Sequence, residues 1–417
     1  MCEGFGLITL YLNIKSLTLL LVYQIIFLYN MNTNILHLFI IVLLYSCSAA
    51  EAIDEPTDEN DGKVPEQVIG TFSHPGILFN FEDLFRIKEQ AGYNEEPWML
   101  GYSILEKNTD YNYSVSGPYE IVEQTETQRT RNALSADSQM AYHCALMWII
   151  TENSKYAEKA VEILNAWSYT LKSIQGEGDM LMASWYGFNL INAAEILRYT
   201  YSKWNYEDIK QSEIMFQEVF YGLIKDWKRG RAGNWDTAIT KMHLAIGVYL
   251  DDRTIFDRAI AFYKSQIHES NGTLKYNIYE TGQNCESARD QTHAQMGLGG
   301  LAESCEVAWK QGIDLYSFMD NRLLKGFEYT AKYNLWYDDL PPFISNVYGD
   351  VISDIDRGEF QPIYEMVYNH YFNRKKVDDS EIEYTMKVVE AVRAKGGESF
   401  SALHLGLGSL MYNIVKK

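Results

Sequence analysis

Two groups of polar residues interrupt otherwise apolar stretches of this sequence and carry side chains suited to holding an anion or moving a proton. The first, residues 286–295, reads Glu-Ser-Ala-Arg-Asp-Gln-Thr-His-Ala-Gln. On a helix, Arg289 and His293 share one face, with Glu286 one turn earlier. Burying so many polar groups costs stability unless they are paired or used. The pattern therefore indicates either a functional cluster or a structural Glu-Arg-His network.

The second group, residues 232–237, reads Ala-Gly-Asn-Trp-Asp-Thr and leads into a helix that bears His243. His243 falls on the apolar stripe of that helix. A lone histidine there is either a hydrogen-bonded core residue or a catalytic one, and the sequence leaves both open. Asn234 precedes His243 by nine positions, which is half a turn out of phase. The two side chains therefore converge only if Asn234 lies in a loop before the helix.

Several classes of function lack their usual motifs. The sequence has no Gly-rich phosphate loop, His-Glu-x-x-His, paired Cys motif or Gly-x-Ser-x-Gly. It offers no sound metal site, so we expect neither metal nor cofactor. With 36 Lys and Arg against 56 Asp and Glu, the net charge of -20 argues against a nucleic-acid partner. An anionic ligand would have to be held by a local site.

The elements that must position these groups are predominantly helices, because apolar residues recur at helical spacing from about residue 80 onward. Segments such as 140–150 and 180–196 are apolar nearly all round, which suits an inner ring of helices wrapped by an outer one. We predict an all-α fold, an (α/α) toroid or barrel of antiparallel helix pairs; an irregular α-bundle is the alternative. Helices are expected over residues 81–92, 95–108, 136–153, 155–172, 180–201, 205–229, 236–251, 253–266, 287–311, 322–335, 362–374 and 380–396.

Two segments stand outside this helical pattern. Thr273–Tyr279 is the best candidate for a strand. Tyr337–Gln361 reads as a long loop with several acidic residues, and long loops in compact domains are often functional. We predict that this loop covers a cleft.

The chain divides by composition into three parts. Residues 1–47 are an apolar leader whose last residue, Cys47, closes a pattern similar to a lipoprotein cleavage box. Cleavage near Ala49 by a plain secretory pathway and a retained membrane anchor are the alternatives, and Met31 competes with Met1 as the true start. Residues 48–70 form an acidic flexible tether, and 71–417 form one catalytic domain. We expect an exported protein, either an outer-membrane or cell-surface lipoprotein or a periplasmic one, touching the membrane only through a lipid at Cys47.

Several short segments resemble one family. They are Gly233-Asn234-Trp235, residues 247–252, residues 255–257, Arg289-Asp290-Gln291-Thr292-His293-Ala294-Gln295 and residues 308–316. Together they are similar to the alginate lyase superfamily with a helical toroid, and most to polysaccharide lyase family thirty-eight, which includes alginate and glucuronan lyases. The resemblance spans roughly residues 75–375, and the Arg-Asp-Gln-x-His-x-Gln run is its most specific part.

The resemblance implies β-elimination on an anionic uronic-acid polysaccharide, with alginate expected first and glucuronan next. Such an enzyme neutralises the C5 carboxylate, removes the proton at C5 and protonates the 4-O-linked leaving group. In the better-known alginate lyases of the superfamily, an Asn, a His, an Arg and a Tyr share these tasks. Asn234 matches the Asn and Arg289 the Arg. Trp235 stands where the family has His, and Met296 where it has Tyr.

These departures leave the base and the acid to other residues. We predict His243 as the base, with Asn234, Arg289 and His293 around the carboxylate. A tyrosine is expected as the acid, or as combined acid and base, and the leading positions are Tyr186, Tyr276 and Tyr279.

Five further residues are predicted to contact the substrate. Trp185 and Trp235 have flat faces on which a sugar ring can stack, and packing in the core is their alternative role. Gln291 and Gln295 belong to the polar cluster, and Arg357 offers a guanidinium from the long loop.

Two other functions compete with a lyase. A glycoside hydrolase on the same kind of toroid needs two carboxyl groups across the sugar, and Asp236 with Asp290 is the obvious pair. A surface lipoprotein that binds glycans without cleaving them fits the leader and the aromatic content but does not require His243.

Overall fold

The computed structural model describes residues 71–125, 127–230 and 233–414. The chain divides into two units, Met1–Ile69 and Gly70–Lys417, and only the second contains described residues. The predicted leader with Cys47 and the predicted tether lie outside the described residues. Within them, no helix is long and apolar enough to cross a membrane.

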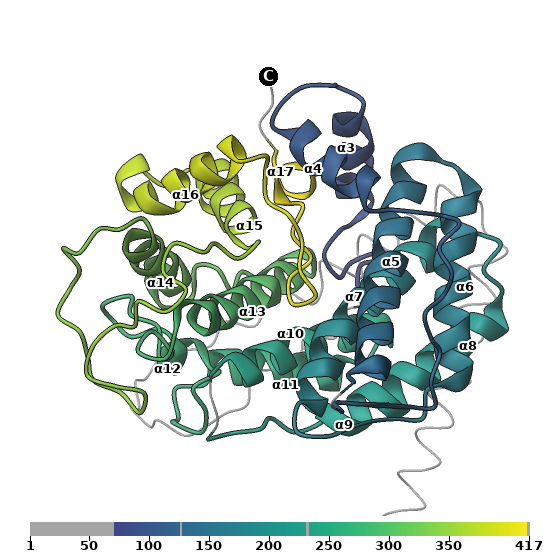
Figure 1. The fold of residues 1–417 in the computed structure, drawn as a ribbon, viewed down its shortest axis with the longest axis horizontal. Coiled ribbons are helices and arrows are strands. Elements are labelled where there is room, and N and C mark those ends of the chain that lie inside the picture. Colours follow the sequence, from purple (N-terminus) through teal and green to yellow (C-terminus); the bar gives the residue numbers. More distant parts are fainter. Residues whose placement is uncertain (1–70, 126, 231–232, 415–417) are drawn as a thin grey trace, which may run out of the picture. The chain divides into compact units, whose positions relative to one another are not determined.

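Helices provide nearly all of the regular structure (Figure 1). In chain order the elements are α3 (Phe81–Ala91), α4 (Trp98–Lys107), β1 (Ile121–Glu123), α5 (Arg129–Thr151), α6 (Ser154–Thr170), β2 (Ser173–Gln175), α7 (Asp179–Thr200), α8 (Tyr206–Ile214), the π-helix η1 (Met215–Tyr221), α9 (Gly222–Ile224), α10 (Gly233–Tyr249), α11 (Arg253–Lys264), α12 (Leu274–Asn277), α13 (Gln291–Lys310), α14 (Phe318–Asn334), α15 (Tyr364–Tyr368), the π-helix η2 (Asn369–Lys375), the 3₁₀ helix η3 (Asp379–Glu381), α16 (Glu383–Ala394) and α17 (Gly408–Met411).

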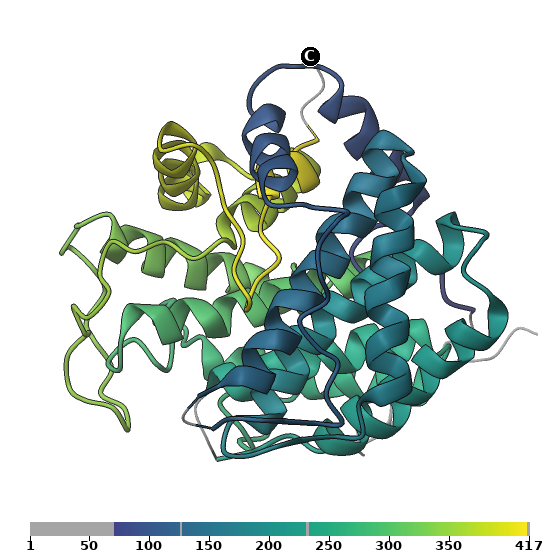
Figure 2. The same cartoon turned by 45° about the vertical axis from the view of Figure 1, so that its right-hand side comes forward.

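Four helices form the inner layer of the fold. Helices α5, α7, α10 and α13 pack on one another in that order, and α6, α11 and α14 cover α5, α10 and α13 from outside (Figures 1 and 2). Nearly every residue of α7, α10 and α13 is buried, whereas α6 and α11 bury one face each. The predicted (α/α) toroid of antiparallel helix pairs is thereby confirmed.

The inner helices begin at the same end of the ring. Strands β1 and β2, directly before α5 and α7, pair in parallel. Deeper along the helices, the Lys241 Nζ of α10 lies 4.6 Å from the ring centre of Phe188 in α7. The same Nζ lies 2.6 Å from the Glu303 carboxylate of α13. Near the far ends of α7 and α10, the Arg198 Nη1 donates to the Tyr249 carbonyl (2.9 Å). At the start of α10, the Asn234 N–H donates to Glu286, which lies just before α13 (2.8 Å). Each pair of helices thus makes two contacts in the same order along the chain, so these helices run parallel and the polar groups at the starts of α10 and α13 meet.

The C-terminal segment 397–407 reaches down between the helices to the middle of this inner layer (Figures 1 and 2). Lys241 donates a hydrogen bond to the Leu403 carbonyl (2.9 Å), and the His404 Nδ1 lies 3.2 Å from the Glu303 carboxylate. All three polar side chains, from Lys241, Glu303 and His404, are buried. Breaking such an ion pair would leave a buried charge without a partner, which is costly. The contacts among Lys241, Glu303 and His404 therefore hold the segment in place.

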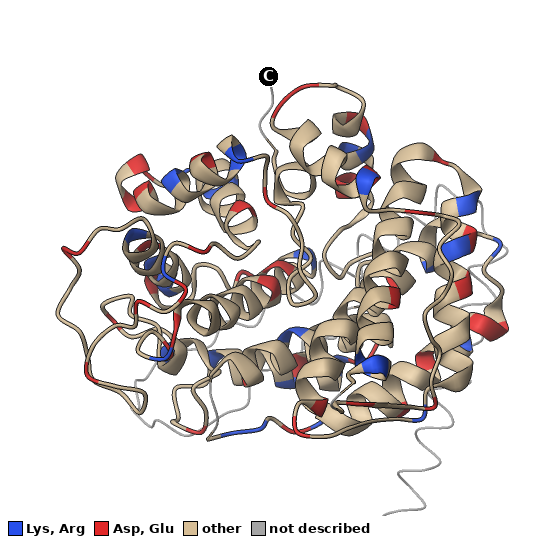
Figure 3. Cartoon of the chain, in the orientation of Figure 1, with Lys and Arg blue, Asp and Glu red and all other residues tan. Residues whose placement is uncertain are grey.

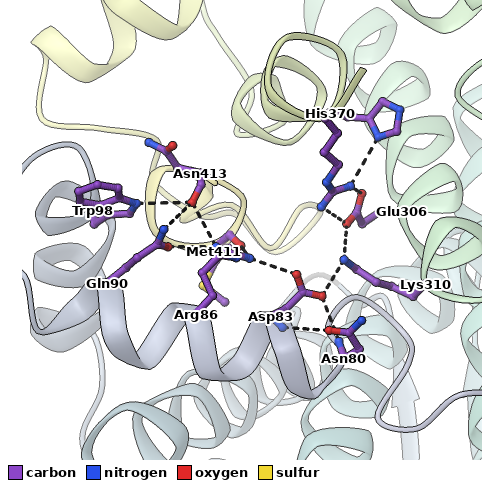
Figure 4. Close-up of polar contacts among 11 residues, drawn as sticks. Asn80, Asp83, Arg86, Gln90, Trp98, Glu306, Lys310, His370, Met411 and Asn413 are labelled. Atoms are coloured by element: carbon purple, nitrogen blue, oxygen red, sulfur yellow. Dashed lines mark hydrogen bonds and ion pairs between the residues drawn. The ribbon is translucent and has the colours of Figure 1, made fainter. Parts of the chain in front are cut away.

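Polar contacts also join α3 to the C-terminal part of the domain (Figure 4). Arg86 donates to the Met411 carbonyl (2.8 Å), and Asp83 accepts from Lys310 (2.7 Å). Lys310 in turn pairs with Glu306 of α13 (3.1 Å). These contacts therefore hold α3, α13 and the C-terminal segment together, although they are far apart in the sequence.

Several predicted boundaries need correction. Helix α10 begins at Gly233 rather than at residue 236, and α13 begins at Gln291 rather than at residue 287. The strand predicted at Thr273–Tyr279 is wrong, because this segment contains the one-turn helix α12 and only Ile278 forms a bridge, with Asn284. The predicted loop is confirmed: residues 337–361 contain no helix and only the isolated bridge between Asn346 and Gly349.

Candidate active site

The first turn of α10 carries Asn234 at the end of the ring where the inner helices start. Its backbone N–H donates to the Oε2 of Glu286 (2.8 Å). The side chain is buried, and its Oδ1 has no hydrogen-bond partner among the described residues. Buried polar atoms are almost always paired, so an unpaired one indicates a place where a ligand group can bind.

Glu286 connects Asn234 to Arg289. Its Oε1 accepts a hydrogen bond from the Arg289 Nη1 (3.0 Å). Burial raises the pKa of Glu286 to about 7, although the Asn234 N–H and the Arg289 charge both favour the carboxylate. The Arg289 side chain remains 34% exposed, so it is fixed at one end and accessible at the other.

Asp290 and His293 form a second pair beside Arg289. Asp290 is the N-cap of α13 and accepts the backbone N–H of His293 (2.7 Å). Its Oδ2 lies 2.6 Å from the His293 Nδ1 and 3.8 Å from the Arg289 Nε. A carboxylate on Nδ1 favours the tautomer that leaves Nε2 as a proton acceptor. Because the His293 side chain is 29% exposed, it can meet a ligand.

The long loop brings Tyr348 to the same cluster. The Arg289 guanidinium lies 5.8 Å from the centre of the Tyr348 ring. Burial, helped by the charge of Glu286, raises the pKa of Tyr348 to about 12. The phenol is therefore protonated at neutral pH and able to donate a proton. The sequence prediction missed Tyr348, although it identified the loop that carries it.

A cavity of about 440 Å³ lies next to Tyr348 and is lined also by Gly230, His268 and the segment 269–271. Asn271 is close to α10, since a Cβ added at Gly233 would lie 2.5 Å from the Asn271 carbonyl oxygen. The loop before α10 is basic (Figure 3), and Lys228 and Arg229 in it are exposed. Two cations thus stand near the site of a chain whose net charge is strongly negative, and one of them, Arg229, pairs with Glu269 at the cavity (3.1 Å).

His243 lies away from this cluster, in the core. Its side chain is 1% exposed, its Nε2 lies 2.7 Å from the Ile224 carbonyl, and Trp227 and Tyr221 pack against its ring. Burial lowers its pKa to about 4. Since Asn234 is inside α10, the two residues point to opposite sides of the helix. The geometry therefore favours the core role and does not support His243 as the base.

The three predicted tyrosines also make their contacts elsewhere. Tyr186 is buried and its hydroxyl accepts from the Arg131 Nε (3.1 Å). The Tyr276 hydroxyl donates to the Gln266 carbonyl (2.8 Å). Tyr279 is half-buried, and its backbone N–H donates to the Gln283 carbonyl. Within the described residues, none of these three side chains forms a hydrogen bond to Arg289 or His293, whereas the Tyr348 ring lies beside Arg289.

The predicted tryptophans keep part of each ring accessible. Trp185 and Trp235 are both partly buried and pack against the core. Trp235 follows Asn234 directly, and the Lys228 Nζ lies 5.4 Å from its ring centre. Trp235 therefore stays a candidate for stacking against a sugar, and Trp185 stays a prediction.

Gln291, Gln295 and Arg357 hold the long loop in place. Gln291 donates to the Ser353 carbonyl (2.8 Å), and Gln295 donates to the Glu359 carbonyl (2.8 Å). Arg357 donates to the Tyr333 carbonyl (2.9 Å) and pairs with Asp338 (2.8 Å). These side chains are occupied by protein groups, so their predicted contact with substrate is replaced by a role in positioning the loop.

The carboxyl pair of the hydrolase hypothesis does not face one cavity. Asp236 is 1% exposed and accepts the backbone N–H groups of Lys228 (2.7 Å) and Arg229 (3.1 Å), together with the Ser270 hydroxyl. It therefore fixes the loops around α10, while Asp290 orients His293. Among the described residues, no group of three or more His, Cys, Asp or Glu side chains is arranged to hold a metal ion.

Comparison with known proteins gives one family. A family model described as alginate lyase matches residues 90–339, more than half of the chain. No curated protein matches the chain.

Solved structures share the fold at low sequence identity. An alginate lyase from Bacteroides ovatus matches with a TM-score of 0.56 and 14% identity, over 82% of this chain and 100% of that one. Alginate lyase A1-III from Sphingomonas species A1 matches with a TM-score of 0.58 and 12% identity, over 84% and 99%. A histidine-to-alanine variant of alginate lyase A1-III, complexed with a tetrasaccharide, matches with a TM-score of 0.60 and 12% identity, over 83% and 98%.

Proposed function

The chain belongs to the alginate lyase family, and on that premise we propose that it cleaves alginate by β-elimination at the cluster around Arg289. One observation carries the proposal for the site: an unbroken series of contacts runs from Asn234 through Glu286, Arg289 and Asp290 to His293. This series supports the proposal that the Asn234 carboxamide, the Arg289 guanidinium and the His293 imidazole act on one sugar residue.

In the proposed reaction, Arg289 and Asn234 bind the C5 carboxylate of a uronate. Neutralising that charge makes the C5 proton more acidic, which is the main obstacle to the reaction. The Nε2 of His293 accepts the proton, while Asp290 stabilises the imidazolium that forms. The C4–O bond then breaks and a C4=C5 double bond forms, so one product ends in an unsaturated uronate.

The leaving oxygen needs a proton, and Tyr348 is the proposed donor. Its pKa of about 12 keeps the phenol protonated at neutral pH, and Arg289 beside it stabilises the phenolate formed during the reaction. Proton transfer by positioned side chains accelerates reactions by about 10²- to 10⁴-fold. His293 and Tyr348 together thus supply the base and the acid.

An anionic polymer suits the surroundings of the site. Lys228 and Arg229 are exposed in the loop that precedes Asn234, and Trp235 stands beside them with part of its ring accessible. Cations near a binding site raise the local concentration of an anionic substrate and speed its association. Glucuronan, which carries the same carboxylate, is the second substrate to test.

The first experiment follows the ultraviolet absorbance of the conjugated double bond while the protein acts on alginate, glucuronan and pectate in turn. We expect a rise with alginate. New reducing ends without that rise would mean hydrolysis and would refute elimination. A rise with glucuronan alone would keep the reaction and change the substrate.

We also propose export with a lipid on Cys47, on the evidence of the leader sequence alone. The test is metabolic labelling with a radioactive fatty acid in a bacterial host that processes lipoproteins. Label on the wild-type chain and its loss in Cys47→Ala are expected. Equal label on both would exclude Cys47 as the acceptor.

A further inference from the structure

Glu286 is the one member of the cluster that contacts both halves of the proposed carboxylate site. Its Oε2 accepts the Asn234 N–H (2.8 Å) and its Oε1 accepts from the Arg289 Nη1 (3.0 Å). The side chain is buried, so it does not meet the substrate itself. A buried acidic side chain next to an anion-binding arginine opposes binding of an anionic substrate through charge, and its presence therefore calls for another role.

We propose that Glu286 is a positioning residue, which fixes the first turn of α10 and the guanidinium of Arg289 relative to each other so that Asn234 and Arg289 meet the same uronate carboxylate. The inference rests on the proposed function. One bond from the Glu286 carboxylate to Arg289 and one to the Asn234 N–H tie the guanidinium to the first turn of α10. Preorganised groups stabilise a transition state without reorganising during the reaction.

The surroundings of Glu286 support this role. The backbone of Glu286 is itself held in place, because its N–H donates to the Asn284 Oδ1 (2.8 Å). Four ionisable groups face its carboxylate: Arg289, Asp290, the Cys285 thiol and the Tyr348 phenol. Among these groups only Arg289 carries a positive charge, so its contact favours the ionised form of Glu286 and loss of that contact favours the protonated form.

The test is Glu286→Gln, which keeps the size of the side chain but replaces one acceptor oxygen with an NH₂ donor. That donor faces either the Asn234 N–H or Arg289, so one of the two bonds is lost. We expect kcat/KM on alginate to fall about 10- to 100-fold, the range that the loss of one charge-assisted hydrogen bond gives, with part of the loss in kcat. Burial raises the pKa of Glu286 to about 7, so we expect an acidic limb of the wild-type pH profile near that value and a shift of this limb in the variant.

Glu328→Gln is the matched control. Glu328 also accepts two bonds, from the backbone N–H groups of Tyr384 (2.9 Å) and Thr385 (2.8 Å), and burial likewise raises its pKa. It lies on α14, away from Arg289, so this variant should keep the wild-type kcat/KM and pH profile.

A double-mutant cycle, with the urea midpoint of each variant measured alongside to detect poor folding, tests whether the effect of Glu286→Gln depends on Arg289. If Glu286 acts through Arg289, the change Glu286→Gln should lower kcat/KM much less in an Arg289→Lys background than in the wild type. Additive losses, or a kcat/KM of Glu286→Gln within threefold of the wild type, would overturn the positioning role while leaving the lyase proposal intact. A wild-type protein that produces no unsaturated ends would overturn both.

Discussion

Replacing Asp290 by Asn separates the catalytic role of this side chain from its structural one. Asp290 caps α13 through the His293 N–H (2.7 Å) and also holds the His293 Nδ1 (2.6 Å). Asn is about as good an N-cap as Asp, so the cap survives the substitution. The substitution does remove the carboxylate that selects the tautomer of His293 and stabilises its imidazolium.

The size of the effect follows from that one contact. A hydrogen bond to a charged group contributes about 1.5–3 kcal/mol, and 1.36 kcal/mol corresponds to a factor of ten in rate. Asp290→Asn should therefore lower kcat about 10- to 150-fold. The free energy of unfolding should change by less than about 1 kcal/mol, because the cap is kept and only its charge at the helix N-terminus is lost.

Initial rates of absorbance increase on alginate, together with urea unfolding, measure both quantities. Asp252→Asn is the control, since Asp252 caps α11 through the Ile255 N–H (3.1 Å) and its side chain forms no hydrogen bond to any described histidine. The control should match the wild type in kcat. If Asp290→Asn also keeps kcat within threefold, His293 is not the base and the proposed assignment fails.

Three further predictions test other parts of the account. Tyr348→Phe keeps the aromatic ring beside Arg289 but removes the proton donor. We expect kcat to fall about 10²-fold or more, with little change in melting temperature. An unchanged kcat would exclude Tyr348 as the acid. Replacing Lys228 and Arg229 together by Ala should raise KM and weaken the dependence of kcat/KM on salt, with kcat nearly unchanged; an unaltered KM would mean that the basic loop does not meet the polymer. His243 has an ordinary pKa of 6.5 in the unfolded chain and about 4 in the fold, so its contribution to stability is complete above pH 6.5 and is lost as the pH falls from 6.5 to 4. The difference between the two pKa values corresponds to about 3 kcal/mol of unfolding free energy. A folded His243→Gln variant should therefore show a smaller dependence of unfolding free energy on pH between 4 and 6.5, while its specific activity persists. A pH dependence equal to that of the wild type would contradict a buried, neutral His243.

The helices of the inner ring could be predicted because their segments carry apolar residues on nearly every face. Segments that are apolar nearly all round, such as residues 140–150 in α5 and 180–196 in α7, indicate central helices. The starts of these helices could not be predicted as well. Helix α10 begins three residues earlier than expected because Glu286, 52 positions away, satisfies the backbone N–H of Asn234. A partner so distant in sequence leaves no local signal.

Dependence on partners distant in sequence also decides which site residues could be predicted and which could not. Arg289 and His293 stand four positions apart, and their polarity within an apolar stretch was enough to single them out. Tyr348 lies beside Arg289 because glutamines elsewhere in the chain, Gln283, Gln291 and Gln295, bind the backbone of the long loop. In sequence, glutamines that hold a loop look the same as glutamines that bind a sugar.

His243 shows where spacing alone was ambiguous. The apolar stripe correctly indicated that its side chain faces the core side of α10. What decides its role is the Ile224 carbonyl, which ends the α9 segment 19 residues earlier and lies 2.7 Å from the ring nitrogen. No pattern within α10 contains that information.

Mass spectrometry of the products from alginate oligosaccharides, made by the wild type and by His293→Ala, is the measurement that tests the central claim most directly. The wild type should yield fragments whose non-reducing ends are lighter than hydrolysis products by one water molecule, and His293→Ala should yield almost none. Wild-type fragments with the mass of hydrolysis products would contradict elimination. Unsaturated fragments formed equally fast by His293→Ala would contradict the assignment of the base.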